Sequence, residues 1–225
     1  MTKSENTINI LMIDDHPSMI EGYKSILAFN DLDLEIQVVA AYNCESAYHI
    51  IIDKKNSLLF DFIFIDLSLP HFEEKNIFSG KDLAHLAQEH MRYAKIVILT
   101  SHAESFLLYE IHKYINPIGI LVKSDFTADE LLLAFSKMTH GEIYRSKTVQ
   151  QSIKDFLGTN FVLDELNRQI IILLAQGIKT KNLPVHVNLT LSAINKRKAQ
   201  IRVFFNLDDG SDENIINAAK KRGFI

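Results

Sequence analysis

Short apolar runs, separated by stretches with helical spacing, occupy the first part of the chain. The runs lie at 8–13, 35–41, 61–65, 95–100 and 118–122 and consist largely of Ile, Val, Leu and Phe. All but the second lack the apolar–polar alternation of half-exposed strands, so they predict strands buried on both faces of a parallel sheet. Helices are predicted after them at 17–29, 44–55, 81–91, 103–115 and 127–138. Five strand–helix units of this spacing predict a doubly wound α/β domain.

The pattern changes after Gly141, where no further strand is expected. Residues 141–160 are predicted to be a linker with one short helix at 146–157, and the rest of the chain predicts helices at 164–176, 180–187, 190–205 and 212–222. Three of these helices have suitable N-caps in Asp164, Thr190 and Ser211 or Asp212. We therefore expect an α/β domain over 1–140, a linker over 141–160 and a small all-α domain over 161–225.

Charge separates the same two parts. From residue 161 onward the sequence has ten Lys and Arg against six Asp and Glu, a net charge of +4. Because the whole chain carries −4, the preceding residues carry −8. An acidic first part and a basic tail indicate domains with different partners, and they make nucleic acid a candidate partner of the second.

The composition of the chain excludes several classes of protein but does not indicate a function. Hydrophobic residues make up 47% and charged residues 23%, as in ordinary globular proteins. No apolar stretch has the length of a bilayer span, so no membrane association is expected. The polar residues 1–9 give no secretory signal, and Cys44, the sole cysteine, excludes an internal disulfide. A cytoplasmic location is therefore expected.

Polar residues stand where four of the predicted strands end. They are Asp14 and Asp15, Asp66, Thr100 and Lys123. Ligands bind at the carboxyl ends of the strands in open parallel sheets, so these side chains are expected to converge on one edge.

The converging groups suit phosphoryl transfer to a carboxylate. Asp14, Asp15 and Asp66, with the backbone carbonyl of Ser68, supply oxygens of the kind that Mg2+ takes. A bound divalent ion offsets the repulsion between a carboxylate and an incoming phosphoryl group, whose transfer depends mainly on positioning and electrostatics. Lys123 can pair with phosphoryl oxygens, and the Thr100 hydroxyl can donate to them.

Residues 8–138 resemble the receiver domain of bacterial two-component response regulators. The motifs that carry the resemblance are Ile13-Asp14-Asp15-His16-Pro17, Asp66-Leu67-Ser68-Leu69-Pro70, Ile98-Leu99-Thr100-Ser101 and Leu121-Val122-Lys123. The resemblance implies a flavodoxin-like (βα)5 fold, a sensor histidine kinase as phosphodonor, and no enzymatic role beyond slow autodephosphorylation. It also implies roles by position: Asp66 as phosphoacceptor, Asp14 and Asp15 as metal-binding acids, Thr100 as switch hydroxyl and Lys123 as phosphate partner.

Two departures from this family pattern concern switching. Ile120 stands three residues before the lysine, where the family usually has Tyr or Phe. An aliphatic side chain there has to signal by packing, because it has no ring to swing inward. The segment 70–80 is longer than the usual connection after the phosphoacceptor, and we consider both a role in partner choice and a tolerated insertion.

The tail has the elements of a helix-turn-helix. The stretch Thr190–Phe205 contains four cations and no acid, with Ile194, Ile201 and Phe205, and Leu191 one turn earlier, as the inner stripe. A basic helix of this size fits the major groove. The expected DNA-binding positions are Thr190, Ser192, Asn195, Lys196, Lys198 and Arg202.

The tail also resembles the LuxR-type DNA-binding domain of NarL/FixJ regulators, best in Ile172–Gly177 and Val187–Thr190. Two departures stand out. Leu166-Asn167 replaces the family's Arg-Glu pair, so an internal ion pair is expected to be lost, and Pro184 lies in the scaffold helix, where it removes a backbone donor.

The resulting hypothesis is a cytoplasmic response regulator that is phosphorylated on Asp66 with Mg2+, dimerises and binds double-stranded DNA. One alternative is a receiver whose tail binds a protein partner instead. Another is an aspartyl-phosphate phosphatase, although Ser68 stands where such enzymes usually have a second Asp. Nucleotide binding is disfavoured because no Gly-rich phosphate loop follows the first strand.

Overall fold

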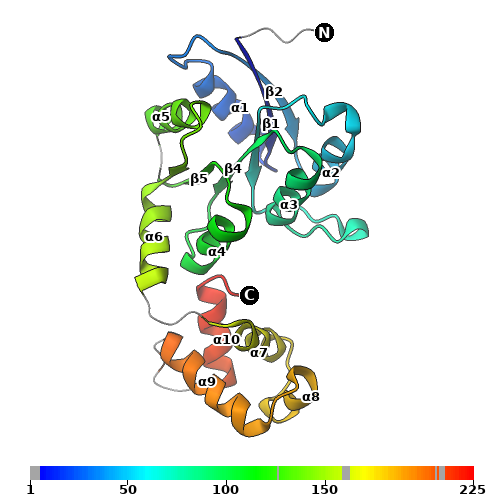
Figure 1. Ribbon diagram of the computed structural model, residues 1–225, viewed down its shortest axis with the longest axis vertical. Helices are drawn as coiled ribbons and strands as arrows, with labels where there is room; N and C mark the ends of the chain where they lie inside the picture. The colour runs from blue at the N-terminus through cyan, green and yellow to red at the C-terminus, as the bar shows by residue number, and fades with distance from the viewer. Residues whose placement is uncertain (1–5, 126, 159–162, 206, 208–210) are drawn as a thin grey trace. The chain divides into compact units, whose positions relative to one another are not determined.

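The computed structural model describes residues 6–125, 127–158, 163–205, 207 and 211–225. The chain forms two compact units, one of Met1–Ala103 with Glu110–Gln150 and the other of Glu104–Tyr109 with Gln151–Ile225. Figure 1 labels most of the helices and strands of both. No described helix is long and apolar enough to cross a membrane.

A parallel sheet forms the centre of the first unit, with strand order β2-β1-β3-β4-β5-β6. The strands are β1 (Thr7–Ile13), β2 (Glu35–Ala41), β3 (Phe62–Asp66), β4 (Lys95–Thr100), β5 (Gly119–Val122) and β6 (Tyr144–Arg145). The helical segments between them are α1 (Pro17–Leu27), α2 (Cys44–Ile52), η1 (Lys54–Asn56), η2 (Glu73–Lys75), α3 (Gly80–His90), α4 (Ser105–Glu110), its π-helical continuation η3 (Ile111–Ile115), and α5 (Ala128–Thr139).

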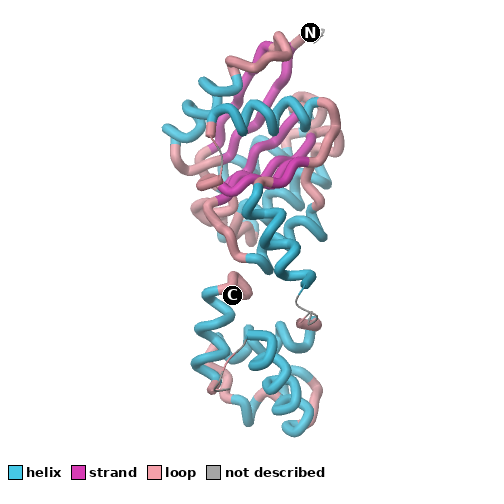
Figure 2. Tube along the Cα trace, turned by 90° about the vertical axis from the view of Figure 1, so that its left-hand side faces the viewer, coloured by secondary structure: helices cyan, strands magenta, loops and turns pink. Residues whose placement is uncertain are grey.

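Helices cover both faces of this sheet, α1 and α5 on one side and α2 and α3 on the other (Figures 1 and 2). Alternate strand residues point to opposite faces, so one set packs under α1 and α5. That cluster contains Ile10, Met12, Phe62 and Phe64 with Phe135 of α5, all almost fully buried. The predicted doubly wound (βα)5 fold is confirmed.

The expectation that no strand follows Gly141 was wrong. β6 pairs with β5 through Tyr144 opposite Gly119 and Arg145 opposite Ile120. A two-residue strand is too short to show any hydrophobic period, and its pairing with β5 creates it. The predicted linker helix follows as α6 (Lys147–Gly158).

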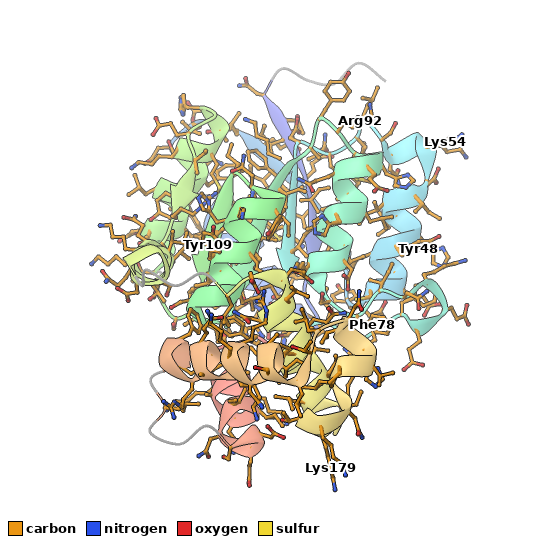
Figure 3. The ribbon with its side chains drawn as sticks, turned by 60° about the horizontal axis from the view of Figure 1, so that its bottom comes forward. Tyr48, Lys54, Phe78, Arg92, Tyr109 and Lys179 are labelled. Atoms are coloured by element: carbon orange, nitrogen blue, oxygen red, sulfur yellow. The ribbon has the colours of Figure 1, made fainter. Side chains whose placement is uncertain are left out.

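The long segment 70–80 is an ordered excursion. Phe72 and Ile77 exchange two backbone hydrogen bonds, of 2.8 and 3.2 Å, and both side chains are buried. The Phe72 ring meets Tyr48 of α2 edge to face, with ring centroids 5.5 Å apart. Tyr48 and the half-exposed Phe78 are labelled in Figure 3. Neighbouring Cys44 is fully buried, and burial raises the pKa of its thiol to about 11.

The described part of the second unit contains helices and no strand. It includes most of α4 and α6, and its remaining helices follow residue 163. They are α7 (Glu165–Ala175), η4 (Thr180–Asn182), α8 (Pro184–Val187), α9 (Leu191–Phe205) and α10 (Asp212–Lys221). The predicted caps are confirmed: Asp164, Thr190 and Ser211 each accept a hydrogen bond from the backbone N–H three residues on. Pro184 starts α8, where the missing donor costs nothing.

The core of this unit confirms most of the predicted inner stripe of α9. Ile194, Ile201 and Phe205 are buried with Ile170 of α7 and Ile215 of α10. Leu191 does not belong to the stripe, since it is 43% exposed. Leu191 is the first residue of α9, and this end of the helix lies outside the core.

Candidate functional site

The side chains at the carboxyl edge of the sheet converge as predicted. Asp14 follows β1, Asp66 ends β3, Thr100 ends β4, and all three are buried. Lys123 follows β5, and its Nζ lies 2.7 Å from Asp14 Oδ2 and 2.7 Å from Asp66 Oδ2. A single ammonium group therefore joins two strands that are far apart in the sequence.

This pairing keeps the lysine charged. Burial alone would lower the pKa of Lys123, but its hydrogen bonds and charge interactions with Asp14 and Asp66 outweigh burial and raise the pKa. Its ammonium thus offsets the negative charge of the two carboxylates that flank it.

Thr100 is joined to Lys123 by a backbone hydrogen bond. Its carbonyl accepts from Lys123 N at 2.7 Å, and its hydroxyl accepts from His102 N at 3.0 Å. Ser68 is exposed, and its Oγ lies 3.0 Å from His102 Nε2. The roles assigned to the Thr100 hydroxyl and the Ser68 carbonyl stay predictions.

Asp14 also belongs to a cluster with the two residues that follow it. One ligand atom each of Asp14, Asp15 and His16 lies within 4.8 Å of the other two. Asp15 Oδ1 is 2.7 Å from His16 Nδ1, but the geometry is not that of a hydrogen bond, and within the described chain this enclosed oxygen has no donor. An enclosed carboxylate oxygen without a donor, beside a second carboxylate, fits a hard divalent cation. His16 stands in the quoted motif, but nothing in that motif singled it out as a possible ligand.

Gly80 shapes the return of the chain beside Asp66. A Cβ on Gly80 would lie 1.9 Å from the carbonyl oxygen of Asp66 and 2.9 Å from Ile65 Cγ2. Gly80 N also donates to Leu67 O at 3.0 Å. The start of α3 therefore rests directly on the backbone of the predicted phosphoacceptor, and only glycine allows this approach.

Ile120, at the predicted switch position, is fully buried in β5. It pairs in register with Ile98 of β4 and Arg145 of β6. Its part in switching stays a prediction.

The predicted DNA-binding positions of α9 divide into two groups. Thr190, Ser192, Asn195, Lys196 and Arg202 are exposed. Ser192, Asn195 and Arg202 recur at helical spacing on one face, with a shallow hollow of about 220 Å³ beside Asn195 and Arg202. This face is open to a ligand.

Lys198 differs from the others. Its side chain is 16% exposed and bonds to Asp212 and, at 2.9 Å, to Thr180 Oγ. The expectation that Lys198 points outward was wrong, because a carboxylate of α10 lies within its reach. Sequence spacing on α9 carries no information about that distant partner.

The family's Arg-Glu pair is absent, as expected, but a different ion pair joins the same helices. Arg197 of α9 donates to both carboxylate oxygens of Asp164, at 2.7 and 2.6 Å, and to Asn167 Oδ1 at 3.1 Å. Asn167, one of the residues that replace the family pair, is buried. The first and third helices of the motif are thus joined by a different pair.

A parallel α/β sheet with an acidic pocket and a half-buried lysine at its carboxyl edge, followed by a helical unit, defines a class of two-domain signalling proteins. The model of the response regulator receiver domain matches residues 10–135. The chain belongs to this family.

Similar solved structures extend over almost the whole chain. They include RcsB dimers bound to two parallel DNAs, at 19% identity, covering 96% of this chain and 98% of that one with a TM-score of 0.68. RcsB of Salmonella typhimurium matches at 18% identity, 95% and 99% coverage and a TM-score of 0.69. RcsB of Salmonella enterica serovar Typhimurium bound to promoter P1flhDC with the phosphomimetic BeF3- matches at 18% identity, 94% and 97% coverage and 0.69. This likeness shows the fold of both units. Comparison with the curated proteins gives no match.

Proposed function

We propose that this response regulator receives a phosphoryl group on Asp66 from a sensor histidine kinase and binds double-stranded DNA through α9. The observation that carries the first part is the Lys123 ammonium, held at 2.7 Å from both Asp14 and Asp66. The protein acts as a phosphoacceptor in the cytoplasm, and its own chemistry is limited to slow loss of the phosphoryl group.

Phosphorylation uses groups already in place. An Asp66 carboxylate oxygen attacks phosphorus, the new O–P bond replaces the P–N bond of the donor phosphohistidine, and the imidazole leaves with the electron pair. Lys123 has a third N–H beside the two that it gives to Asp14 and Asp66, and this one can meet a phosphoryl oxygen. The Thr100 hydroxyl can rotate to donate to the same group.

Asp14, Asp15, Asp66 and the Ser68 carbonyl are the residues that would hold Mg2+ in this pocket. The ion supplies charge compensation for the phosphoryl oxygens. The enclosed Asp15 oxygen, which accepts no hydrogen bond from the described chain although His16 Nδ1 lies 2.7 Å away, supports this assignment.

The DNA part of the proposal rests on the exposed cation-bearing face of α9 and the net positive charge of the tail. RcsB, which shares the fold, has been solved as dimers on DNA. We propose that this chain likewise pairs when phosphorylated, because two copies can address two half-sites. A protein partner for the tail is the second candidate, and the internal engagement of Lys198 favours it by removing one cation from the DNA face.

Intact-mass spectrometry with acetyl phosphate and Mg2+ tests the phosphoacceptor. Wild type is expected to gain one phosphoryl group, and Asp66→Asn none, because the amide is not a nucleophile. Lys123→Met should lower the yield, since it leaves the carboxylates unpaired. Labelling of Asp66→Asn would contradict the assignment. Sedimentation velocity on the labelled and unlabelled wild type then tests the dimer, which an unchanged monomer would exclude.

A further inference from the structure

The segment 144–148 is tied to the whole length of β5. Tyr144 N donates to Ile118 O at 2.8 Å, and Ser146 N donates to Ile120 O at 3.0 Å. Val122 N in turn donates to Ser146 Oγ at 3.2 Å. The start of α6 therefore lies beside β5 (Figure 1), next to the residue that precedes Lys123.

The first turn of α6 is capped by a carboxylate from outside the helix. Asp125 accepts from Ser146 Oγ at 2.6 Å, from Thr148 Oγ at 2.6 Å and from Thr148 N at 2.8 Å. Helix N-termini favour such an acceptor and its negative charge. Burial would raise the pKa of Asp125, but the hydrogen bonds from Ser146 and Thr148 outweigh it and lower the pKa, so the cap is the charged form.

Arg145 gives the same segment a second attachment. Its Nη1 donates to Tyr144 O at 2.7 Å and to Ile118 O at 3.2 Å, and its Nη2 donates to Pro117 O at 2.9 Å. Burial lowers the pKa of its guanidinium to about 10. Because Arg145 pairs in register with Ile120, both side chains lie on the same side of the sheet. The aliphatic switch position is therefore bordered by a segment that leads directly into α6.

Only one residue, Ser124, separates the capping Asp125 from Lys123 of the phosphorylation pocket. Lys123 holds Asp14 and Asp66 with its ammonium and the carbonyl of Thr100 with its backbone N–H. Asp125 N donates to Val122 O at 2.9 Å, which closes a tight turn around Lys123. A movement of the backbone at Lys123 would be passed through this turn to Asp125.

We propose that residues 144–148, capped by Asp125, form a relay that couples phosphorylation of Asp66 to the first turn of α6. The relay rests on the proposed function. A phosphoryl group on Asp66 gives Lys123 and Thr100 a new acceptor, the turn 122–125 follows Lys123, and the hydrogen bonds of Asp125 to Ser146 and Thr148 change. In other members of the family an aromatic ring at the Ile120 position transmits the signal by swinging inward. In this chain the relay performs that transmission instead. α6 extends to Gly158, whereas the first unit ends at Gln150, so the signal enters the connection to the second unit.

Hydrogen exchange of the full-length chain, followed by mass spectrometry with and without acetyl phosphate and Mg2+, tests the relay. In wild type, phosphorylation is expected to change exchange of the α6 amides at 147–150 by about fivefold, the effect of weakening one N-cap. Asp125→Asn and Thr148→Val should accept the phosphoryl group as wild type does. Their first turn should exchange faster even without phosphate and show no further response.

Asp129→Asn is the matched control, since Asp129 is exposed in the first turn of α5. It should respond as wild type does. Phosphorylation of wild type without any change at 147–150 would overturn the relay while leaving the phosphoacceptor intact, and so would a full response in Asp125→Asn. Absence of added phosphate in the intact mass would instead refute the proposed function and the relay with it.

Discussion

A single ammonium group holds two buried carboxylates of the acidic pocket together. Asp14 and Asp66 are both buried, and two enclosed carboxylates repel unless a cation joins them. Lys123 provides that cation from the end of β5. Its position means that any new anion on Asp66 competes directly with Asp14 for the same charge.

Gly80 and Gly22 give a matched pair of glycine predictions. Gly80→Ala is expected to destabilise the fold by about 3 kcal/mol or more, because its Cβ would overlap the Asp66 carbonyl and no flexible side chain can yield. Gly22→Ala, in α1 with nothing within 4 Å of the new Cβ, should instead stabilise by roughly 0.5–1 kcal/mol. Urea unfolding at pH 7 measures both. Equal stability of the two variants would show that α3 can move away from Asp66.

Ion pairs anchor α9 to its neighbouring elements. Arg197 joins α9 to Asp164 and Asn167 at the start of α7, and Lys198 joins it to Asp212 of α10 and Thr180 of η4. Adjacent residues of α9 thus fix it to elements on two sides. The exposed face that carries Asn195 and Arg202 is held by contacts that do not use its own side chains.

Asp212 predicts a pH dependence for this anchoring. Burial would raise the pKa of Asp212, but hydrogen bonds from Lys198 and Thr180 lower it below its ordinary value of 3.8. A carboxyl whose pKa is depressed in the folded state stabilises the fold above its unfolded pKa, and this stabilisation is lost as the pH falls through the folded pKa. Asp212→Asn should therefore be less stable than wild type at pH 7, by on the order of 0.5–1 kcal/mol given its exposure.

The difference between wild type and Asp212→Asn should shrink as the pH falls below 3.8. Chemical unfolding at pH 7 and pH 3 measures it. Glu213→Gln, at the neighbouring exposed position of α10, serves as control and should match wild type at both values. A difference of the same size at both pH values would refute an electrostatic role for Asp212.

Elements differ in how far the sequence could predict them. Asp14, Asp66, Thr100 and Lys123 were predictable because parallel topology brings strand ends together whatever their sequence distance. β6 was not, since two residues show no period. Lys198 was misplaced because Asp212, its partner, lies in another helix, and only packing determines which cation on α9 stays free. The cap of α6 by Asp125 was missed for the same reason.

At the scale of the whole molecule, the distribution of charge and the hydrophobic clusters both separate the α/β part of the chain from the helical tail. The tail from residue 161 carries +4 and the rest −8, and the two main hydrophobic clusters share no residue. By net charge, the tail from residue 161 attracts a nucleic acid and residues 1–160 repel it, so exposed cations on α9 should matter more than the total charge.

Lys196→Ala tests this division. It should weaken binding of the full chain to double-stranded DNA and reduce the slope of log affinity against log salt by about 1, as loss of one phosphate contact does. Lys220→Ala removes the same charge from an exposed position of α10 and should leave the slope unchanged. Fluorescence anisotropy across a salt series on a mixed-sequence duplex measures both. Salt-insensitive binding in wild type, or equal slopes in both variants, would favour the protein-binding alternative.

The two-residue strand β6 also bears on solubility. β5 reads Gly119-Ile120-Leu121-Val122, is buried throughout and carries no charge, so with a bare edge it would be a template for pairing with other chains. The segment 144–146 occupies that edge by taking the carbonyls of Ile118 and Ile120. On the opposite edge, β2 exposes Glu35 and Gln37, polar residues that discourage such pairing. A signal that detached β6 would therefore expose the aggregation-prone edge of β5. For this reason we expect phosphorylation to change the hydrogen bonds that cap α6 while β6 stays paired with β5.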